Sequence, residues 1–192
     1  MLQPIRRWTS PPDFYINTFN PRTSKPLEDD ELALVIRAIR DAVPQLTGST
    51  LTAGTIESGN GARDQRQGVI NVRFIYDPTS EFCGQANVGA NPGDVRINYD
   101  RCANVCGSLK VTPETIAHEI GHAMGFWHTS GNGIMSPSRP RRCANVDFSA
   151  QERLHARLAY SRPPGNTDAD KDPASFLGFT APETTPIVYC RR

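Results

Sequence analysis

The chain has 192 residues, with 21 Lys or Arg against 20 Asp or Glu, so its formal net charge is +1. This length suits one domain with a sizeable core, and the near-neutral balance gives no electrostatic case for binding nucleic acid or anionic membranes. No apolar run approaches the roughly 20 residues that cross a bilayer. We therefore expect neither nucleic acid binding nor membrane insertion.

The first half of the sequence predicts one helix among short strands. Residues 13–17 form a short strand after a Pro-rich beginning. In residues 28–43 apolar side chains recur at i, i+3, i+4 and i+7, which predicts an amphipathic helix that Pro44 ends. The β-branched segments 50–56 and 68–76 predict two further strands.

The second half predicts two strands followed by two helices. Residues 83–90 form a weak strand, poor in bulky side chains and interrupted by glycines, and residues 94–100 form an alternating one. Thr112 and Pro113 have the residue types of an N-cap and first helical turn. A last helix is predicted at 149–161.

Three of the four histidines fall within one stretch of eleven residues. His118 and His122 are four residues apart, so on a helix they share one face and can bind one zinc ion together. Glu119 projects at the neighbouring angle, where a general base could take a proton from a zinc-bound water. Gly125 lets the helix stop, and the chain can then bring back His128 as a third ligand. Three protein ligands leave the fourth position open, as in a catalytic zinc site.

This stretch matches all five fixed positions of the H-E-x-x-H-x-x-G-x-x-H signature, and so it resembles the metzincins, a clan of zinc metallopeptidases. A bare H-E-x-x-H would be weaker, because two histidines on a helix face can simply be packed or solvent-facing. Residues 133–137 resemble the Met-turn that runs beneath the metal in this clan. The alternative for Met135 is an ordinary core methionine.

Within the metzincins the chain looks closest to the matrixins. Thr129 is similar to the serine that follows their third histidine, Ser136–Pro137 resembles their Met-x-Pro, and residues 148–154 resemble the start of their last helix. The resemblance covers roughly residues 8–160. It implies an α+β fold with a mixed, mostly parallel five-stranded sheet, an antiparallel edge strand, a backing helix, the zinc helix, the Met-turn and a C-terminal helix.

The domain boundary is expected near residue 162, with a metzincin-like catalytic domain over 1–162 and a Pro-rich tail over 163–192. Acidic residues alternate at 168–172 as in a calcium loop. However, Pro173 and Phe179 stand where such a loop has its glycine and bidentate glutamate. A solvated linker is the preferred interpretation, and calcium is unsupported.

The resemblance implies a zinc endopeptidase with one catalytic zinc and a protein or peptide substrate bound in extended form along the edge strand. Arginines beyond the Met-turn would favour an acidic side chain just after the cleaved bond, unless they only point to water. The candidate substrate-binding residues are Asn87, Val88, Gly89, Ala90, Ser136, Pro137, Arg139 and Arg141. Matrixins also bind a structural zinc through histidines, but here the matching positions are Asn87, Arg96 and Asn98, so we expect no second zinc.

Five cysteines suggest an oxidising compartment, so we expect a secreted or extracytoplasmic protein in preference to a reduced cytosolic one. Cys102 and Cys106 are close enough to staple one loop, and the odd count leaves at least one thiol without a partner in the chain. Residues 1–7 lack the apolar centre of a signal peptide. We expect that a signal and pro-segment were removed, or that export follows another route, and that the protein is a monomer.

Two other classes of function stay open. One is a binding module that kept a zinc site without turnover, although the intact Glu119 argues against it. The other is a structural zinc domain whose fourth ligand is Cys143 or a segment of another chain. His155, far from the motif in sequence, is interpreted as a surface or packed histidine.

Overall fold

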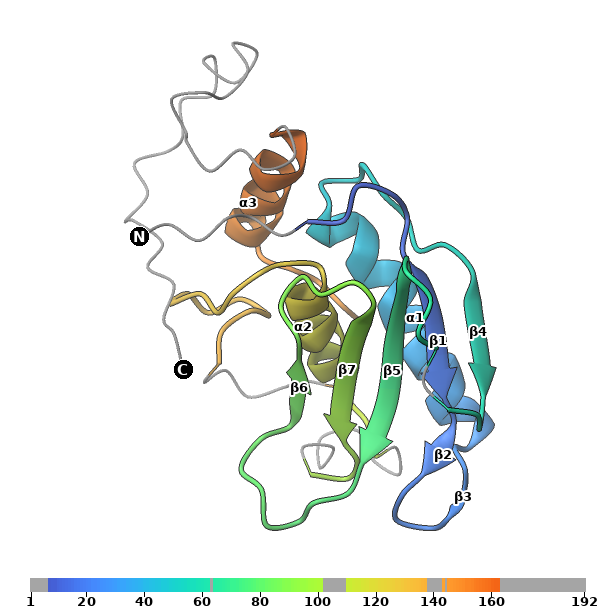
Figure 1. Ribbon diagram of the computed structural model, residues 1–192. Coiled ribbons are helices and arrows are strands. Elements are labelled where there is room, and N and C mark those ends of the chain that lie inside the picture. The colour runs from blue at the N-terminus through green and yellow to red at the C-terminus, as the bar shows by residue number, and fades with distance from the viewer. Residues whose placement is uncertain (1–6, 63, 102–109, 138–142, 144, 163–192) are drawn as a thin grey trace.

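A computed structural model describes the chain between residues 7 and 162 except for four gaps, that is, residues 7–62, 64–101, 110–137, 143 and 145–162. The predicted tail at 163–192 lies outside the described residues, as do Arg139 and Arg141. Within the described part, helices stand behind a single five-stranded sheet (Figure 1).

The sheet has the predicted mixed topology. In spatial order its strands are β4 (Ile56–Gly59), β1 (Asp13–Asn17), β5 (Val69–Ile75), β7 (Gly93–Asn98) and β6 (Gly84–Ala86). The first four run parallel to their neighbours, and β6 pairs antiparallel with β7 at the edge. The prediction of a mostly parallel sheet with one antiparallel edge strand is confirmed. A separate short pair, β2 (Phe19–Asn20) and β3 (Lys25–Pro26), is antiparallel.

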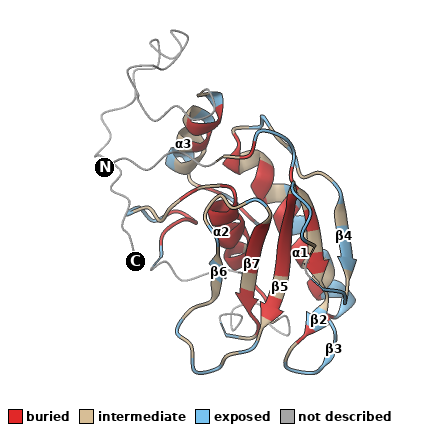
Figure 2. Ribbon diagram, in the orientation of Figure 1, coloured by how far each residue is buried: buried red, intermediate tan, exposed pale blue. Residues whose placement is uncertain are grey.

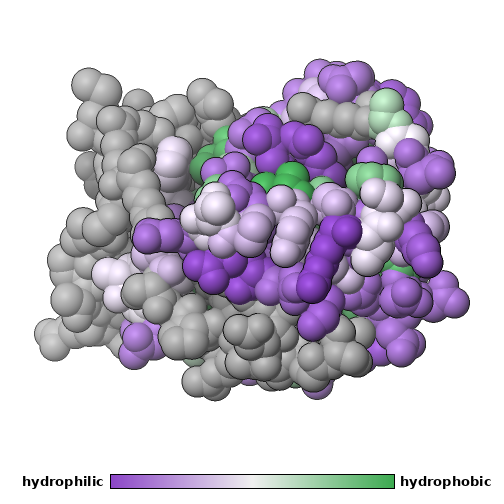
Figure 3. All heavy atoms as spheres, turned by 90° about the horizontal axis from the view of Figure 1, so that it is seen from below, coloured by the Kyte–Doolittle hydropathy of each residue, from purple (hydrophilic) through white to green (hydrophobic). Residues whose placement is uncertain are grey.

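Burial is concentrated in the middle of the sheet. The strands β5 and β7 are mostly buried, whereas the edge strands β4 and β6 hold exposed or half-buried residues (Figure 2). The end of the molecule that carries β2 and β3 is mostly hydrophilic (Figure 3). The edge strand β6 is therefore partly exposed, whereas the central strands beside it are packed in the interior.

Three helices complete the described fold. α1 (Asp29–Leu46) and α2 (Pro113–Ala123) pack against each other behind the sheet, and α3 (Ala150–Ser161) contacts α1 (Figure 1). α2 also contacts β6 and β7, which brings the histidine motif to the antiparallel edge. The largest fully buried side chains are all apolar, and they include Phe14, Ile16, Ile39, Ile70, Ile97, Ile116, Ile120, Met124, Ile134 and Phe148. No helix in the described residues is long and apolar enough to cross a membrane.

The beginnings of α2 and α3 are set by local sequence, and the N-cap of α2 is the predicted one. The Thr112 side chain accepts a hydrogen bond from the Thr115 N–H, and Pro113 occupies the first turn, where its missing N–H costs no helical bond. Ser149 and Glu152 form a reciprocal capping box at the start of α3.

The predicted end of α1 is wrong by one turn. Pro44 lies inside the helix, which continues to Leu46. The last turn is stabilised by the burial of Leu46 and by a local hydrogen bond, in which the Thr47 hydroxyl donates to the Val43 carbonyl at 3.0 Å. Burial of the end of the helix thus outweighs the ordinary tendency of proline to stop it.

The strand predicted at 50–56 is also misplaced, because β4 begins only at Ile56. Its partner β1 is preceded by Pro11 and Pro12, which have no N–H to donate. The Gly54 N–H donates to the Pro12 carbonyl at 2.8 Å, but no regular strand forms there despite the β-branched composition, because Pro12 has no N–H to donate in return.

The predicted edge strand at 83–90 is shortened to Gly84–Ala86. The chain must reverse to pair antiparallel with β7, and Gly89 adopts a left-handed φ of 58° within that reversal. Asn87, Val88, Gly89 and Ala90 thus lie in the connection between β6 and β7 and not on the edge strand itself.

Candidate metal centre

Two of the candidate ligands come from one face of α2. His118 and His122 lie within the helix and are both buried. The helix places them one turn apart, so their rings reach the same point from adjacent levels. The bare H-E-x-x-H motif would also allow two histidines that face solvent. Here both imidazoles are buried, on the face of α2 toward the sheet edge.

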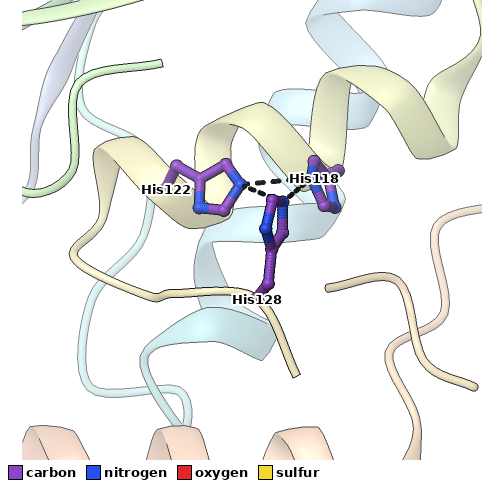
Figure 4. A group of neighbouring side chains, drawn as sticks. All are labelled: His118, His122 and His128. Carbon is purple, nitrogen blue, oxygen red and sulfur yellow. Dashed lines mark hydrogen bonds between the residues drawn. The ribbon is translucent and has the colours of Figure 1, made fainter. Parts of the chain in front are cut away.

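A glycine turn supplies the third ligand. Gly125 has a φ of 105°, in the left-handed region that favours glycine, and the Phe126 N–H donates to the Gly121 carbonyl at 3.0 Å. The chain leaves the helix there and returns along it, so that His128 faces the two helical histidines (Figure 4).

The three imidazoles converge through their Nε2 atoms. Nε2 of His122 lies 3.1 Å from that of His118 and 3.2 Å from that of His128, and the third separation is also 3.2 Å (Figure 4). At Zn–N distances of about 2.0–2.1 Å, such separations correspond to N–Zn–N angles of about 100°, close to tetrahedral. Among the described residues, these three histidines form the group able to hold a metal ion.

Backbone carbonyls fix the tautomer of two of these rings. Nδ1 of His118 lies 2.7 Å from the Ile134 carbonyl oxygen, and Nδ1 of His122 lies 2.7 Å from that of Phe126. A carbonyl can only accept, so each Nδ1 carries the proton, and the neutral ring presents a lone pair at Nε2. Two such lone pairs 3.1 Å apart repel each other unless a cation lies between them. The donor set therefore fits zinc.

Glu119, which directly follows His118 in sequence, lies against the edge strand. Its side chain is buried, and it packs directly over Gly84 of β6. A Cβ at Gly84 would lie 2.6 Å from the Glu119 Cγ and 2.7 Å from its Oε1. The absence of a side chain at Gly84 thus makes room for the Glu119 carboxylate. The sequence alone does not indicate this contact.

The main chain of β6 presents hydrogen-bonding groups on its outer side. Cys83 and Asn87 both bond to β7, at N···O distances of 2.8 and 3.2 Å. Hydrogen-bonded and non-hydrogen-bonded residues alternate along an antiparallel strand. The peptide groups of Gly84 and Ala86 therefore point away from β7, toward the open edge of the sheet.

The Met-turn segment runs beneath α2. Met135 is buried, and its Sδ would collide with a Cβ at Gly121, so the thioether fills the space below the helix between the two helical ligands. The Thr129 N–H donates to the Met135 carbonyl at 3.1 Å. Ser136 is buried, and Pro137, which follows it, is exposed.

The end of α2 is fastened by distant segments. The Trp8 indole donates to the Ala123 carbonyl at 2.8 Å, and the Tyr160 hydroxyl donates to the Met124 carbonyl at 3.1 Å. The N–H of Gly89, a sequence-predicted substrate residue, donates to the carbonyl of His122 at 3.0 Å. Gly89 thus supports the backbone of a candidate ligand.

His155 packs near this end of the helix. Its ring lies 5.9 Å from that of Phe126, whose carbonyl binds His122. Burial lowers the pKa of His155, and the nearby Arg162 lowers it further. His155 contacts the support of the site and is not a member of the histidine cluster.

The positions that match the second zinc site of matrixins have other contacts. Arg96 binds the buried carboxylate of Asp94. The Asn98 amide accepts from the Asp77 N–H and donates to the carbonyls of Asp77 and Phe82, which ties down the loop before β6.

Two cysteines of the described part are disulfide-bonded. Cys83 directly precedes β6, and Cys143 lies between the Met-turn and α3. Cys102 and Cys106, which are close enough in sequence to staple one loop, lie outside the described residues, as does Cys190.

Comparison with protein-family models finds no match, and comparison with curated proteins finds none. Among solved structures, the chain is similar to a GM1-bound form of the ECX AB5 holotoxin, with 13% identity, a TM-score of 0.47 and coverage of 79% of this chain and 80% of that chain. It is also similar to high choriolytic enzyme 1, a hatching enzyme zinc-protease from the medaka fish Oryzias latipes. That likeness has 12% identity and a TM-score of 0.43, and it covers 80% of this chain and 94% of that chain. Both likenesses are distant, and the function proposed below rests on the residues of the site.

Proposed function

We propose that this protein is a zinc-dependent endopeptidase. The observation that carries the proposal is the convergence of three Nε2 atoms at 3.1–3.2 Å, with two of the rings held by carbonyls as metal-binding tautomers. Three histidines leave a fourth position for water or substrate, which is the composition of catalytic zinc sites. When bound, zinc would supply a Lewis acid that lowers the pKa of water to about 7 and polarises the scissile carbonyl.

Glu119 is proposed as the general base and, later, the general acid. It follows the first ligand in sequence, and its carboxylate packs against Gly84 of β6. It would accept a proton from water at one carboxylate oxygen and donate that proton to the leaving amine. A positioned carboxylate in this role contributes about 10²–10⁴-fold to the rate.

We propose that the substrate binds in extended form along β6. The peptide groups of Gly84 and Ala86 face the open edge, so they are the groups that an added strand would pair with. Gly84 also abuts Glu119, so a peptide paired there would pass next to the carboxylate. This assignment moves the main-chain contacts from the predicted residues 87–90 to Gly84 and Ala86.

Several finer statements are also proposals. A matrixin-like subgroup is supported by the sequence resemblance at Thr129 and Ser136–Pro137. An extracytoplasmic location is supported by the disulfide-bonded Cys83 and Cys143. Titration of free thiols in the denatured, unreduced protein tests the second statement, with about one thiol per chain expected and five expected for a reduced protein.

The central experiment measures zinc and peptide cleavage together. The purified protein should hold one zinc per chain by elemental analysis and should cut members of a peptide library, with products identified by mass spectrometry. A chain that holds zinc, fails to bind a hydroxamate chelator and cuts no peptide would instead be a structural zinc domain. A chain that binds the chelator without cleavage would be a binding module.

The side-chain preference after the cleaved bond stays a prediction, because Arg139 and Arg141 lie outside the described residues. If either arginine reads the substrate, peptides with Glu at that position should be cleaved about ten- to hundredfold better than those with Leu, since hydrogen bonds to charged groups contribute about 1.5–3 kcal/mol. Equal cleavage at low salt would show that neither arginine contacts the substrate.

A further inference from the structure

We propose that Glu152 of α3 is a positioning residue of the metal site, which acts on His118 through a single peptide group. The inference rests on the zinc site proposed above. It concerns a carboxylate that lies on a different helix and shares no local sequence motif with the ligands.

The connection runs through the peptide bond between Ile134 and Met135. The N–H of this group, on Met135, donates to Oε1 of Glu152 at 2.7 Å. The C=O of the same group, on Ile134, accepts from Nδ1 of His118 at 2.7 Å. One peptide unit therefore has the Glu152 carboxylate bonded to one end and a candidate metal ligand bonded to the other.

The carboxylate itself is held in place. Its second oxygen, Oε2, accepts from the Ser149 N–H at 2.8 Å and from the Ser149 hydroxyl at 2.9 Å. A Cβ at Gly133 would collide with the Glu152 carboxylate, so the turn passes directly over Glu152. Glu152 thus does two things at once, because it closes the capping box of α3 and anchors the Met-turn.

The expected effect on the metal site is electrostatic. A negative charge that accepts from the N–H polarises the amide and increases the negative charge on its carbonyl oxygen. That oxygen then holds the His118 Nδ1–H more strongly, which fixes the ring and makes its Nε2 a better donor. Direct carboxylate–histidine contacts tune many zinc sites in this way, and here one peptide group relays the interaction.

The test is the zinc dissociation constant, measured by competition with a chromophoric chelator. Glu152→Gln keeps an acceptor for the Met135 N–H but removes the charge, and it should weaken zinc binding about tenfold. Ser149→Ala is the matched control, because it removes the hydroxyl of the capping box and leaves the carboxylate on the peptide. Its zinc affinity should stay within about twofold of wild type, although its apo form should unfold at a lower temperature.

Cobalt substitution gives a second readout that helix stability alone does not change. The visible absorption of the Co²⁺-loaded protein should shift in Glu152→Gln and not in Ser149→Ala. If Glu152→Gln does not fold, Glu152→Asp keeps the charge but is one methylene too short for both contacts, and it should show the same weakening.

The outcomes separate this inference from the proposed function. A wild-type protein that binds no zinc would overturn the proposed function itself. Zinc binding in the wild type with unchanged affinity in the folded Glu152 variant would overturn only the role of Glu152. Equal weakening in Ser149→Ala would do the same, because it would assign the effect to the helix cap.

Discussion

Replacing Gly84 by Ala should displace the proposed base, Glu119, without substituting it. The new methyl carbon would lie 2.6 Å from Glu119 Cγ, 2.7 Å from Oε1 and 2.9 Å from the carboxyl carbon. Ordinary contacts at such a position begin near 3.4 Å. The Glu119 side chain must therefore move by about 0.8 Å, since the atoms in the way belong to it and not to the backbone.

A displacement of this size should matter more for catalysis than for folding. A misplacement of about 1 Å in a reacting group can cost about 10²-fold in rate, which is about 2.7 kcal/mol of barrier. Overpacking by one methyl group costs about 1–3 kcal/mol of stability, less than the 5–15 kcal/mol of a typical domain. We expect a folded protein with wild-type zinc content and kcat/KM reduced about 100-fold.

The assay compares kcat/KM, zinc content and thermal unfolding for Gly84→Ala and a control. Gly131→Ala is the control, because a Cβ at Gly131 meets no atom of the described residues within 4 Å and its φ lies outside the left-handed region. It should keep full activity. If Gly84→Ala holds zinc and cleaves peptides within twofold of wild type, then the position of Glu119 against β6 has no part in the reaction.

Four other variants test separate parts of the site and fold. Glu119→Gln should keep zinc and lose about 10²–10⁴-fold or more of the activity, and activity within a few-fold of wild type would reassign the base. His128→Ala should lose stoichiometric zinc by elemental analysis, and full retention would remove this residue from the ligand set. Thr112→Ala removes the acceptor of the Thr115 N–H and should lower the free energy of unfolding by about 1 kcal/mol in urea titrations. Burial lowers the pKa of His155 below its ordinary 6.5, so the unfolded chain protonates this histidine at a higher pH than the folded chain does. The free energy of unfolding should therefore fall as the pH drops below about 6.5. The fall should be smaller in His155→Gln, and an unchanged pH dependence in that variant would contradict this reasoning.

The sequence predicts the centre of the site far better than its surroundings. The spacing of His118, His122 and His128 is local, and a helix followed by a glycine turn is enough to bring them together. The sheet topology was likewise predicted through a resemblance that begins at these residues. By contrast, the contact of Gly84 with Glu119 joins residues 35 positions apart in the chain. A pattern of local spacing cannot predict such a contact.

The misplaced elements have a similar cause. The helix runs past Pro44 because Leu46 is buried, and β4 starts late because its partner strand starts late. Both outcomes depend on neighbours that are remote in sequence, which propensity and pattern do not include. Glu152 forms a local capping box with Ser149, three residues before it, whereas its bond to the Met-turn follows from tertiary packing.

The fastening of the end of α2 has a consequence for how the protein folds. Its final carbonyls bind Trp8, 115 positions before Ala123, and Tyr160, 36 positions after Met124. Closing such long loops is slow, because the chain entropy is lost before the contacts form. We expect the turn that carries His128 to become ordered late, so that high-affinity metal capture coincides with completion of the native state. Stopped-flow refolding with Co²⁺ would reveal this as visible absorption that rises together with the slowest recovery of native fluorescence, and an early rise would contradict it.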